Sequence, residues 1–221
     1  DGDLDLVITG YDGSNRTAAL YLGDGNGGFT KANAGLIGVR RGSSTLGDVD
    51  GDGDLDLVIT GIDSNGQTTT LYLGDGSGGF TKANAGLTSV VNSSSTLGDV
   101  DGDGDLDLVI TGLDQNNNLT TTLYLGDGDG GFSEANAGLT SVFRSSSTMG
   151  DVDGDGDLDL VVTGEDAGGN ETATIYENGA APPAVAVDQG GTSIGDGDTF
   201  DAGTTPEGTD LTTSFTVSNT G

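Results

Sequence analysis

The chain has 221 residues, with 36 acidic and 6 basic side chains and a formal net charge of −30. This charge speaks against nucleic acid and against anionic lipid as partners, because binders of both need a basic face. The sequence contains no histidine and no cysteine, so it offers neither disulfides nor the commonest general base. No apolar stretch approaches the ~20 residues that span a bilayer, and we expect no membrane insertion.

The first predicted element is half of a motif that recurs along the chain. Residues 1–5 read Asp-Gly-Asp-Leu-Asp, the second half of Asp-Val-Asp-Gly-Asp-Gly-Asp-Leu-Asp at 48–56, 99–107 and 151–159. Each full copy, called an aspartate loop below, has Asp at positions 1, 3, 5, 7 and 9 and Gly at position 6. Carboxylates that alternate around a tight glycine turn can converge on one hard cation, and Ca²⁺ takes six to eight oxygen ligands. The loops therefore predict calcium sites. Because residue 1 falls inside a loop, we also expect the chain to be part of a longer polypeptide.

The loops follow one another at spacings of 51 and 52 residues. A period of this size indicates a propeller or a solenoid. Each unit reads as four short β segments, at 43–47, 55–60, 68–73 and 79–88 in the second unit, and no window of 11 residues shows helical spacing. We therefore predict an all-β fold made of propeller-type blades, each with four antiparallel strands in about 51 residues. Two aromatic ladders keep the same period: Tyr21, Tyr72, Tyr124 and Tyr176, and Phe29, Phe80 and Phe132.

The units do not add up to whole blades. Residues 1–42 supply three strands, 43–94 and 95–145 make two complete blades, and 146–178 begin a fourth. A closed propeller has about 4–8 blades, so both ends of this array present unpaired strand edges. Self-association through those edges is an expected property of the chain.

The segment 46–61, which joins an aspartate loop to the strand after it, resembles the FG-GAP and FG-GAP-like (VCBS-type) repeats of integrin α-subunit propellers and secreted bacterial proteins. The resemblance covers about residues 1–178. The family's Phe-Gly pair is replaced by Leu-Gly or Met-Gly, and its Gly-Ala-Pro end by Thr-Gly. These departures point to the bacterial FG-GAP-like branch. The resemblance implies Ca²⁺ ligation by the side chains at loop positions 1, 3, 5 and 9 and by the backbone carbonyl at position 7.

The metal ligands that the resemblance implies lie in four places. They are Asp48, Asp50, Asp52, Asp54 and Asp56; Asp99, Asp101, Asp103, Asp105 and Asp107; Asp151, Asp153, Asp155, Asp157 and Asp159; and, in the incomplete opening site, Asp1, Asp3 and Asp5. Two rival calcium motifs fail on spacing. An EF-hand needs a bidentate Glu at position 12, where this chain has Ile59, and tandem nonapeptide rolls need a period of nine.

Three other features recur along the chain, and the first two have two interpretations each. The segments 24–29, 75–80 and 127–132 are either glycine turns, which we favour, or second cation loops. The aromatic ladders are either packing between blades, which we favour, or a sugar-stacking surface. The hairpins at 12–16, 63–67, 114–119 and 166–171 vary most, which marks a face where a protein or glycan ligand can bind. Sequons for N-glycosylation occur at Asn15, Asn92, Asn118 and Asn170.

The tail departs from the repeat. We divide the chain into blades at 1–179, a Pro-rich linker at 180–183 and a partial β-sandwich at 184–221, with strands expected at 184–187 and 211–218. Residues 214–221 resemble the opening of an Ig-like module of bacterial surface proteins.

Three functions remain open from the sequence. The first is a non-catalytic, calcium-stabilised structural and adhesive protein outside the cell or on its surface. The second is a subunit of an extracellular filament assembled by β-strand addition. The third is a carbohydrate-binding accessory module of a larger secreted enzyme.

Overall fold

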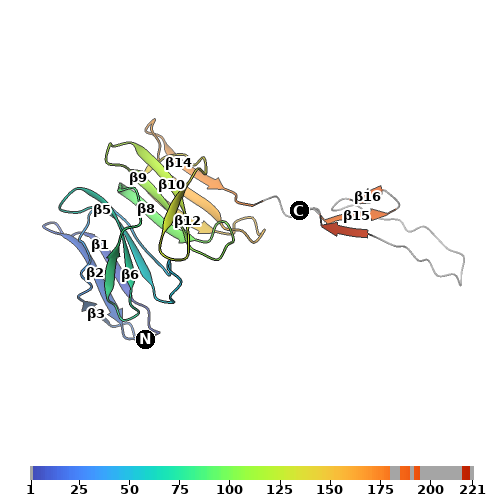
Figure 1. Ribbon diagram of the computed structural model, residues 1–221. Coiled ribbons are helices and arrows are strands. Elements are labelled where there is room, and N and C mark those ends of the chain that lie inside the picture. Colours follow the sequence, from blue (N-terminus) through green and yellow to red (C-terminus); the bar gives the residue numbers. More distant parts are fainter. Residues whose placement is uncertain (1, 180–184, 190–191, 195–215, 220–221) are drawn as a thin grey trace, which may run out of the picture. The chain divides into compact units, whose positions relative to one another are not determined.

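The computed structural model describes residues 2–179, 185–189, 192–194 and 216–219, and all secondary structure in these ranges is β-strand (Figure 1). The chain separates into one unit over residues 1–178 and another over residues 179–221. The first unit contains four antiparallel sheets, each made from consecutive strands. The all-β prediction with antiparallel, blade-like sheets is therefore confirmed.

The strands of the first unit follow the repeat. The first sheet contains β1 (Leu6–Tyr11), β2 (Arg16–Gly23) and β3 (Phe29–Ala32); the second contains β4 (Ser44–Gly47), β5 (Asp56–Ile62), β6 (Gln67–Gly74) and β7 (Phe80–Ala83); the third contains β8 (Val91–Gly98), β9 (Asp107–Leu113), β10 (Leu119–Gly126) and β11 (Phe132–Ala135); the fourth contains β12 (Phe143–Gly150), β13 (Asp159–Glu165) and β14 (Glu171–Tyr176). Within each sheet the strands are paired in chain order.

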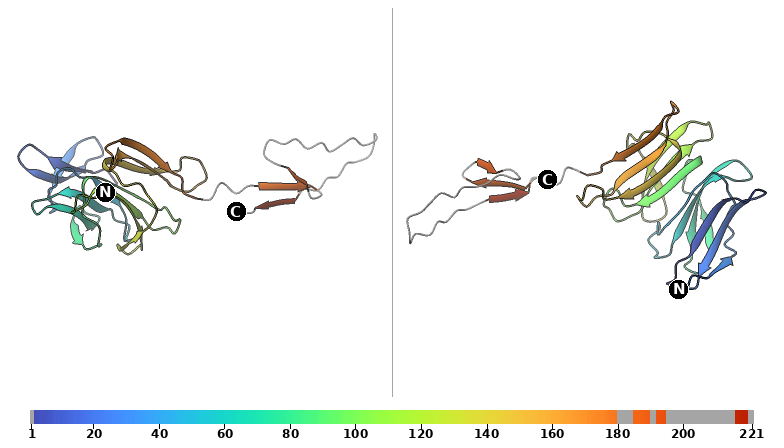
Figure 2. Two further views of the ribbon diagram at one scale, coloured as in Figure 1. Left: turned by 90° about the horizontal axis from the view of Figure 1, so that it is seen from above. Right: turned by 180° about the vertical axis from the view of Figure 1, so that it is seen from behind.

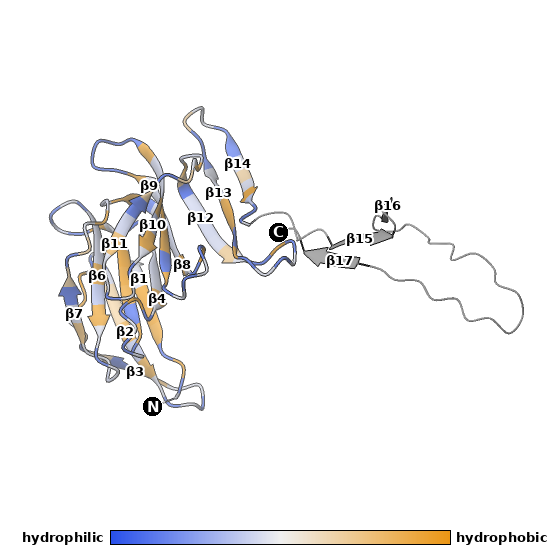
Figure 3. Cartoon of the chain, turned by 45° about the vertical axis from the view of Figure 1, so that its right-hand side comes forward, coloured by the Kyte–Doolittle hydropathy of each residue, from blue (hydrophilic) through white to orange (hydrophobic). Residues whose placement is uncertain are grey.

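The sheets pack face to face in chain order (Figure 2). Successive side chains of a strand point to opposite faces, and in β5 both faces are covered, because Leu57, Val58 and Ile59 are all fully buried. Leu57 and Ile59 belong to the core against which Val7 of the first sheet packs, whereas Val58 belongs to the core shared with the third sheet. We call the face toward the preceding sheet the front face of a sheet, and the face toward the following sheet its rear face. Figure 3 shows the apolar residues of the corresponding strand β13, which lies between β12 and β14.

The tyrosine ladder joins each sheet to the one before it. Tyr72 packs in the core between the first and second sheets, and its hydroxyl oxygen accepts the backbone N–H of Ile37 at 3.0 Å. Tyr124 makes the same bond to Thr88 one repeat later, at 3.1 Å. Phe80 packs in the same core as Tyr72. The prediction that the aromatic ladders mediate packing between blades is confirmed for these residues.

Three predicted boundaries are wrong. The fourth strand of the second sheet ends at Ala83 rather than at residue 88, because the chain then leaves the sheet to meet Tyr124. The next sheet begins at Val91 rather than at residue 95, and the fourth begins at Phe143 rather than at 146. The Asn-Ser-Ser sequence after Val91 contains few β-formers, but a bulge between Val91 and Ser94 keeps it within the strand.

A glycine at the end of each first strand explains the Leu-Gly part of the motif. A Cβ on Gly47 of β4 would lie 2.7 Å from Leu106 Cδ1 and 2.8 Å from Leu97 Cδ1, both of the third sheet. The corresponding Gly150, in the last sheet, has open space at its Cβ position. A side chain at position 47 would therefore have to displace the ends of these two leucines.

We expect Gly47→Ala to lower the free energy of unfolding by about 1 kcal/mol, because the added methyl group displaces the ends of two partly buried leucines. Gly150→Ala is the matched control, and we expect it to be neutral or stabilising by about 0.4–1 kcal/mol. Urea unfolding of both variants measures the difference. Equal losses in the two variants would contradict the packing of the second sheet against the third.

The second unit contains β15 (Val185–Gln189), β16 (Thr192–Ile194) and β17 (Thr216–Asn219) in an antiparallel sheet of order β16-β15-β17. Strands were predicted at 184–187 and 211–218, and the described parts of both segments include β-strand. The predicted linker at 180–183 lies outside the described residues. The Ig-like assignment of the tail stays a prediction.

Candidate metal centres

Each aspartate loop connects the first strand of a sheet to the second. In the second sheet the loop follows β4 and ends where β5 begins, at Asp56. Gly51 and Gly53 have φ angles of +72° and +93°, a region that side-chain-bearing residues rarely adopt. Asp48 Oδ2 accepts the backbone N–H of Gly53 at 3.0 Å, and this bond closes the turn. The glycines and the first aspartate together curl the loop around its own carboxylates.

The loops bring three of their five aspartates together. In each cluster, one carboxylate oxygen per residue lies within 4.8 Å of those of the other two. The clusters are formed by loop positions 1, 3 and 9: Asp48, Asp50 and Asp56; Asp99, Asp101 and Asp107; and Asp151, Asp153 and Asp159. Each cluster of three carboxylates can hold a metal ion.

The aspartate at position 9 also has a structural role that the sequence analysis missed. Asp56 is 1% exposed, and its Oδ2 accepts the backbone N–H of Val49 while its Oδ1 accepts that of Gly74, each at 2.8 Å. Asp107 and Asp159 repeat both bonds in their own sheets. This carboxylate therefore fixes the loop and links it to the end of the third strand.

The electrostatics of the clusters fit a cation. Asp48 Oδ1 is buried and has no hydrogen-bond partner among the described residues, although such atoms are normally satisfied. Burial, followed by the charge of Asp56, raises the pKa of Asp50. Burial likewise raises the pKa of Asp107. A hard divalent cation satisfies the unpaired oxygen and offsets the repulsion, and an all-carboxylate donor set suits Ca²⁺ rather than a softer metal.

The structure does not bring positions 5 and 7 into the clusters. At position 5, Asp52 Oδ1 accepts the N–H of Asp54 at 2.8 Å, and the other two loops repeat this bond. At position 7, the carboxylate of Asp54 lies beside Gly76 of the following glycine turn. The predicted roles of these residues, as a side-chain ligand and a carbonyl ligand, stay predictions.

The opening fragment retains part of the same framework. Asp5, at position 9, accepts the backbone N–H of Gly23 through Oδ1 at 2.9 Å. The carboxylate of Asp3, at position 7, lies beside Gly25. Asp1 lies outside the described residues, so the opening site stays a prediction.

The segments at 24–29, 75–80 and 127–132 are turns, as favoured. Asp75 Oδ1 accepts the backbone N–H groups of Ser77 and Gly79, both at 2.9 Å. These bonds lower the pKa of Asp75, the reverse of the shift at Asp50. The variable hairpins close in the same way, with Asp114 Oδ1 accepting the N–H groups of Asn116 and Asn118. A ligand on those hairpins and glycosylation of the sequons stay predictions.

The comparisons with known proteins agree with this geometry. The family model described as "FG-GAP-like repeat" matches residues 1–59, 48–110 and 99–162, so that each match runs from one aspartate region to just past the next. A search of curated proteins found no match. In the described part of the chain, no helix is long and apolar enough to cross a membrane.

Proposed function

Because the chain belongs to the FG-GAP-like repeat family, we propose that it is a structural and adhesive repeat protein, outside the cell or on its surface, whose aspartate loops bind Ca²⁺. Repeats of this family are generally structural or binding modules and are typical of extracellular proteins. The observation that carries the calcium assignment is the buried, unpartnered Oδ1 of Asp48 within a cluster of three carboxylates.

Calcium has a mechanical role in this proposal. Unit charges about 4 Å apart repel by roughly 4 kcal/mol at an effective dielectric of about 20, so a loop without a cation opposes its own closure. Bound calcium removes this repulsion. Because Asp56 also bonds Val49 and Gly74, the ion fixes the loop, the start of β5 and the end of β6 together. Extracellular calcium modules have dissociation constants of about 10⁻⁴–10⁻³ M, which suits a site of exposed loops.

Calorimetric titration of the full chain tests the proposal. We expect about three equivalents of Ca²⁺ to bind per chain, one for each cluster, and Mg²⁺ to compete weakly because it demands stricter octahedral geometry. Asp153→Asn, which changes an exposed cluster member, is expected to remove one equivalent and leave two. A chain that binds no calcium, or an Asp153→Asn variant that still binds all equivalents, would contradict the assignment.

Self-association is the second candidate function, because the two ends of the array expose faces that are buried elsewhere. On the front face of the first sheet, Leu6 and Ile8 are 42% and 44% exposed, while their counterparts Leu57 and Ile59 are fully buried. On the rear face of the last sheet, Ile175 is 53% exposed. A front face stacked on a rear face would repeat the internal packing and extend the array head to tail, as in a filament.

Sedimentation velocity over a range of concentrations tests this second candidate. We expect the average mass to rise with concentration in calcium, and Ile8→Glu to suppress the rise because a charge then faces the apolar partner surface. A single monomeric species at every concentration would exclude it.

A further inference from the structure

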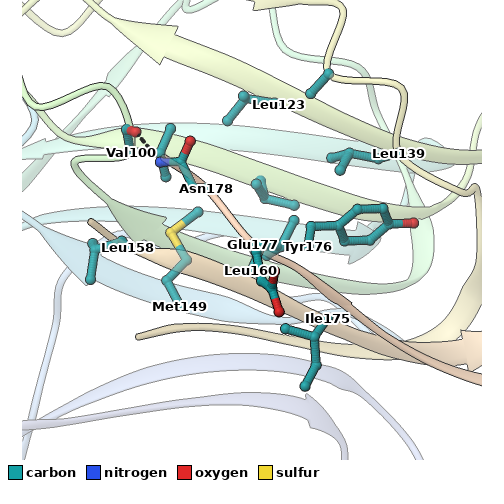
Figure 4. Close-up of a pocket in the computed structure, with 12 residues that line it drawn as sticks. Val100, Leu123, Leu139, Met149, Leu158, Leu160, Ile175, Tyr176, Glu177 and Asn178 are labelled. Carbon is teal, nitrogen blue, oxygen red and sulfur yellow. Dashed lines mark hydrogen bonds between the residues drawn. The ribbon is translucent and has the colours of Figure 1, made fainter. Parts of the chain in front are cut away.

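A pocket of about 590 Å³ lies between the third and fourth sheets (Figure 4). Leu123 and Leu139 line it from the third sheet and the loop after it, and Met149, Leu160 and Tyr176 line it from the fourth. No member of the three aspartate clusters lines the pocket, although Val100 and Leu158 of the aspartate loops do. Aliphatic side chains make up most of its wall, so it suits an apolar group.

Comparison with the preceding repeat shows which apolar group fits the pocket. Nine of the twelve lining residues stand one repeat after a member of the core between the second and third sheets. Three of these pairs are Val58 and Val109, Leu71 and Leu123, and Tyr124 and Tyr176. The core between the second and third sheets also contains Phe132 of β11. One repeat after Phe132, the sequence has Ala184. The pocket therefore corresponds to the place of a phenylalanine that the fourth unit does not encode.

The backbone edge beside the pocket also lacks the partner that it has in the third sheet. In the third sheet, β11 pairs with β10 over four residue pairs, from Leu123 with Ala135 to Gly126 with Phe132. The matching residues of the fourth sheet, 175–178, have no strand on the side away from β13 in the described part of the chain. The edge of β14 and the pocket thus lack the same element, a fourth strand.

One hydrogen bond also reflects the missing fourth strand, because a side chain of the fourth unit takes over the donor's place. The N–H of Gly130, in the turn before β11, donates to the carbonyl oxygen of Val49 at 3.1 Å. The matching carbonyl oxygen of Val100 instead accepts a bond from Nδ2 of Asn178 (Figure 4). A side-chain amide in the fourth sheet therefore takes the place of a glycine N–H that the fourth strand's turn supplies elsewhere.

We propose that this pocket and the outer edge of β14 bind an extended strand from a second polypeptide that has the chemistry of the repeat's own fourth strand. That chemistry is Gly-Gly-Phe followed by small and polar residues. The incoming strand pairs antiparallel with residues 175–178, and its Phe enters the pocket as Phe132 enters the core one repeat earlier. Main-chain hydrogen bonds supply affinity, and the pocket that receives the Phe side chain supplies specificity.

Charge narrows the choice of partner further. The chain has a net charge of −30, and Glu177 lies at the rim of the pocket, so an acidic strand is repelled. Among the chain's own fourth strands, β7 reads Phe-Thr-Lys-Ala and β11 reads Phe-Ser-Glu-Ala. The preferred partner is therefore a neutral or basic strand of the β7 kind.

A synthetic peptide of residues 75–87, Asp-Gly-Ser-Gly-Gly-Phe-Thr-Lys-Ala-Asn-Ala-Gly-Leu, is the probe. Its one Asp and one Lys leave it without net side-chain charge. The matched control is the same peptide with Phe80→Ala. We expect saturable one-to-one binding to the full chain by fluorescence anisotropy, weakened at least about tenfold in the control because burying a Phe side chain contributes that much. Hydrogen exchange is expected to slow at residues 175–178 when the peptide binds.

Several results would overturn the proposal. The first two are an absence of binding and equal affinity for the two peptides. The third is new protection at another edge, such as β3. Protection, before any peptide is added, of amides in 175–178 that bond neither β13 nor Asp159 would show that this edge is already paired within the chain. A fall in particle mass on adding peptide would instead support the proposal and show that a second copy of the chain supplies the strand.

Discussion

Removing calcium is expected to lower the midpoint of thermal unfolding by about 8–16 °C. At a calcium concentration ten times the dissociation constant, binding stabilises the folded state by roughly 1.4 kcal/mol per site, or about 4 kcal/mol for three sites. In a domain of this size each kcal/mol moves the midpoint by about 2–4 °C. Circular dichroism at a β-sheet wavelength, recorded with calcium and with chelator, measures the shift.

Two controls separate calcium binding from general charge screening. Magnesium at the same concentration provides the same ionic strength, and we expect it to restore only a small part of the shift. A variant with Asp50, Asp101 and Asp153 all changed to Asn removes one carboxylate from each cluster. Its midpoint is expected to respond little to calcium. A calcium response of wild-type size in that variant would show that calcium acts elsewhere.

Asp107→Ala is expected to lower the free energy of unfolding by about 2–6 kcal/mol even in chelator. The substitution leaves the partly buried backbone N–H groups of Val100 and Gly126 without their acceptors, and each such group costs about 1–3 kcal/mol. A role in metal binding alone predicts no loss once calcium is absent. Urea unfolding in chelator therefore separates the structural role of position 9 from its role in the cluster.

Asp103→Ala is the matched control for this experiment. Asp103 belongs to the same loop but is exposed, lies outside the cluster and accepts one bond, from Asp105 N–H at 2.9 Å. We expect its loss in chelator to stay below about 1 kcal/mol, as for an exposed hydrogen bond. If the two variants lose equal stability, position 9 has no special structural role. A titration of Asp103→Ala with calcium also tests its predicted role as a ligand.

Much of the fold follows from repetition in the sequence. The period of about 51 residues, the β-forming segments and the turns between them predict antiparallel sheets, and the second sheet has four strands where four were expected. The boundaries of the strands were harder to predict from the sequence. Val91 begins a strand because it is buried beside Leu113, a contact that no local propensity reveals.

The candidate site was predictable in composition but not in geometry. Alternating aspartates identify a cation loop, yet they do not show that positions 1, 3 and 9 converge while Asp52 points to the backbone. The two backbone bonds of Asp56 join groups 7 and 18 residues away, and only the folded sheet brings these together. The pocket beside Tyr176 also depends on comparing two interfaces in space.

Anomalous diffraction from crystals grown in calcium tests the central claim most directly. We expect one anomalous peak in each of the three clusters, at about 2.3–2.6 Å from carboxylate oxygens of loop positions 1, 3 and 9. Such peaks would place the ion where the unpaired oxygen of Asp48 lies. Clusters without a peak, or peaks only at the glycine turns such as 75–80, would contradict the account of these loops as calcium sites.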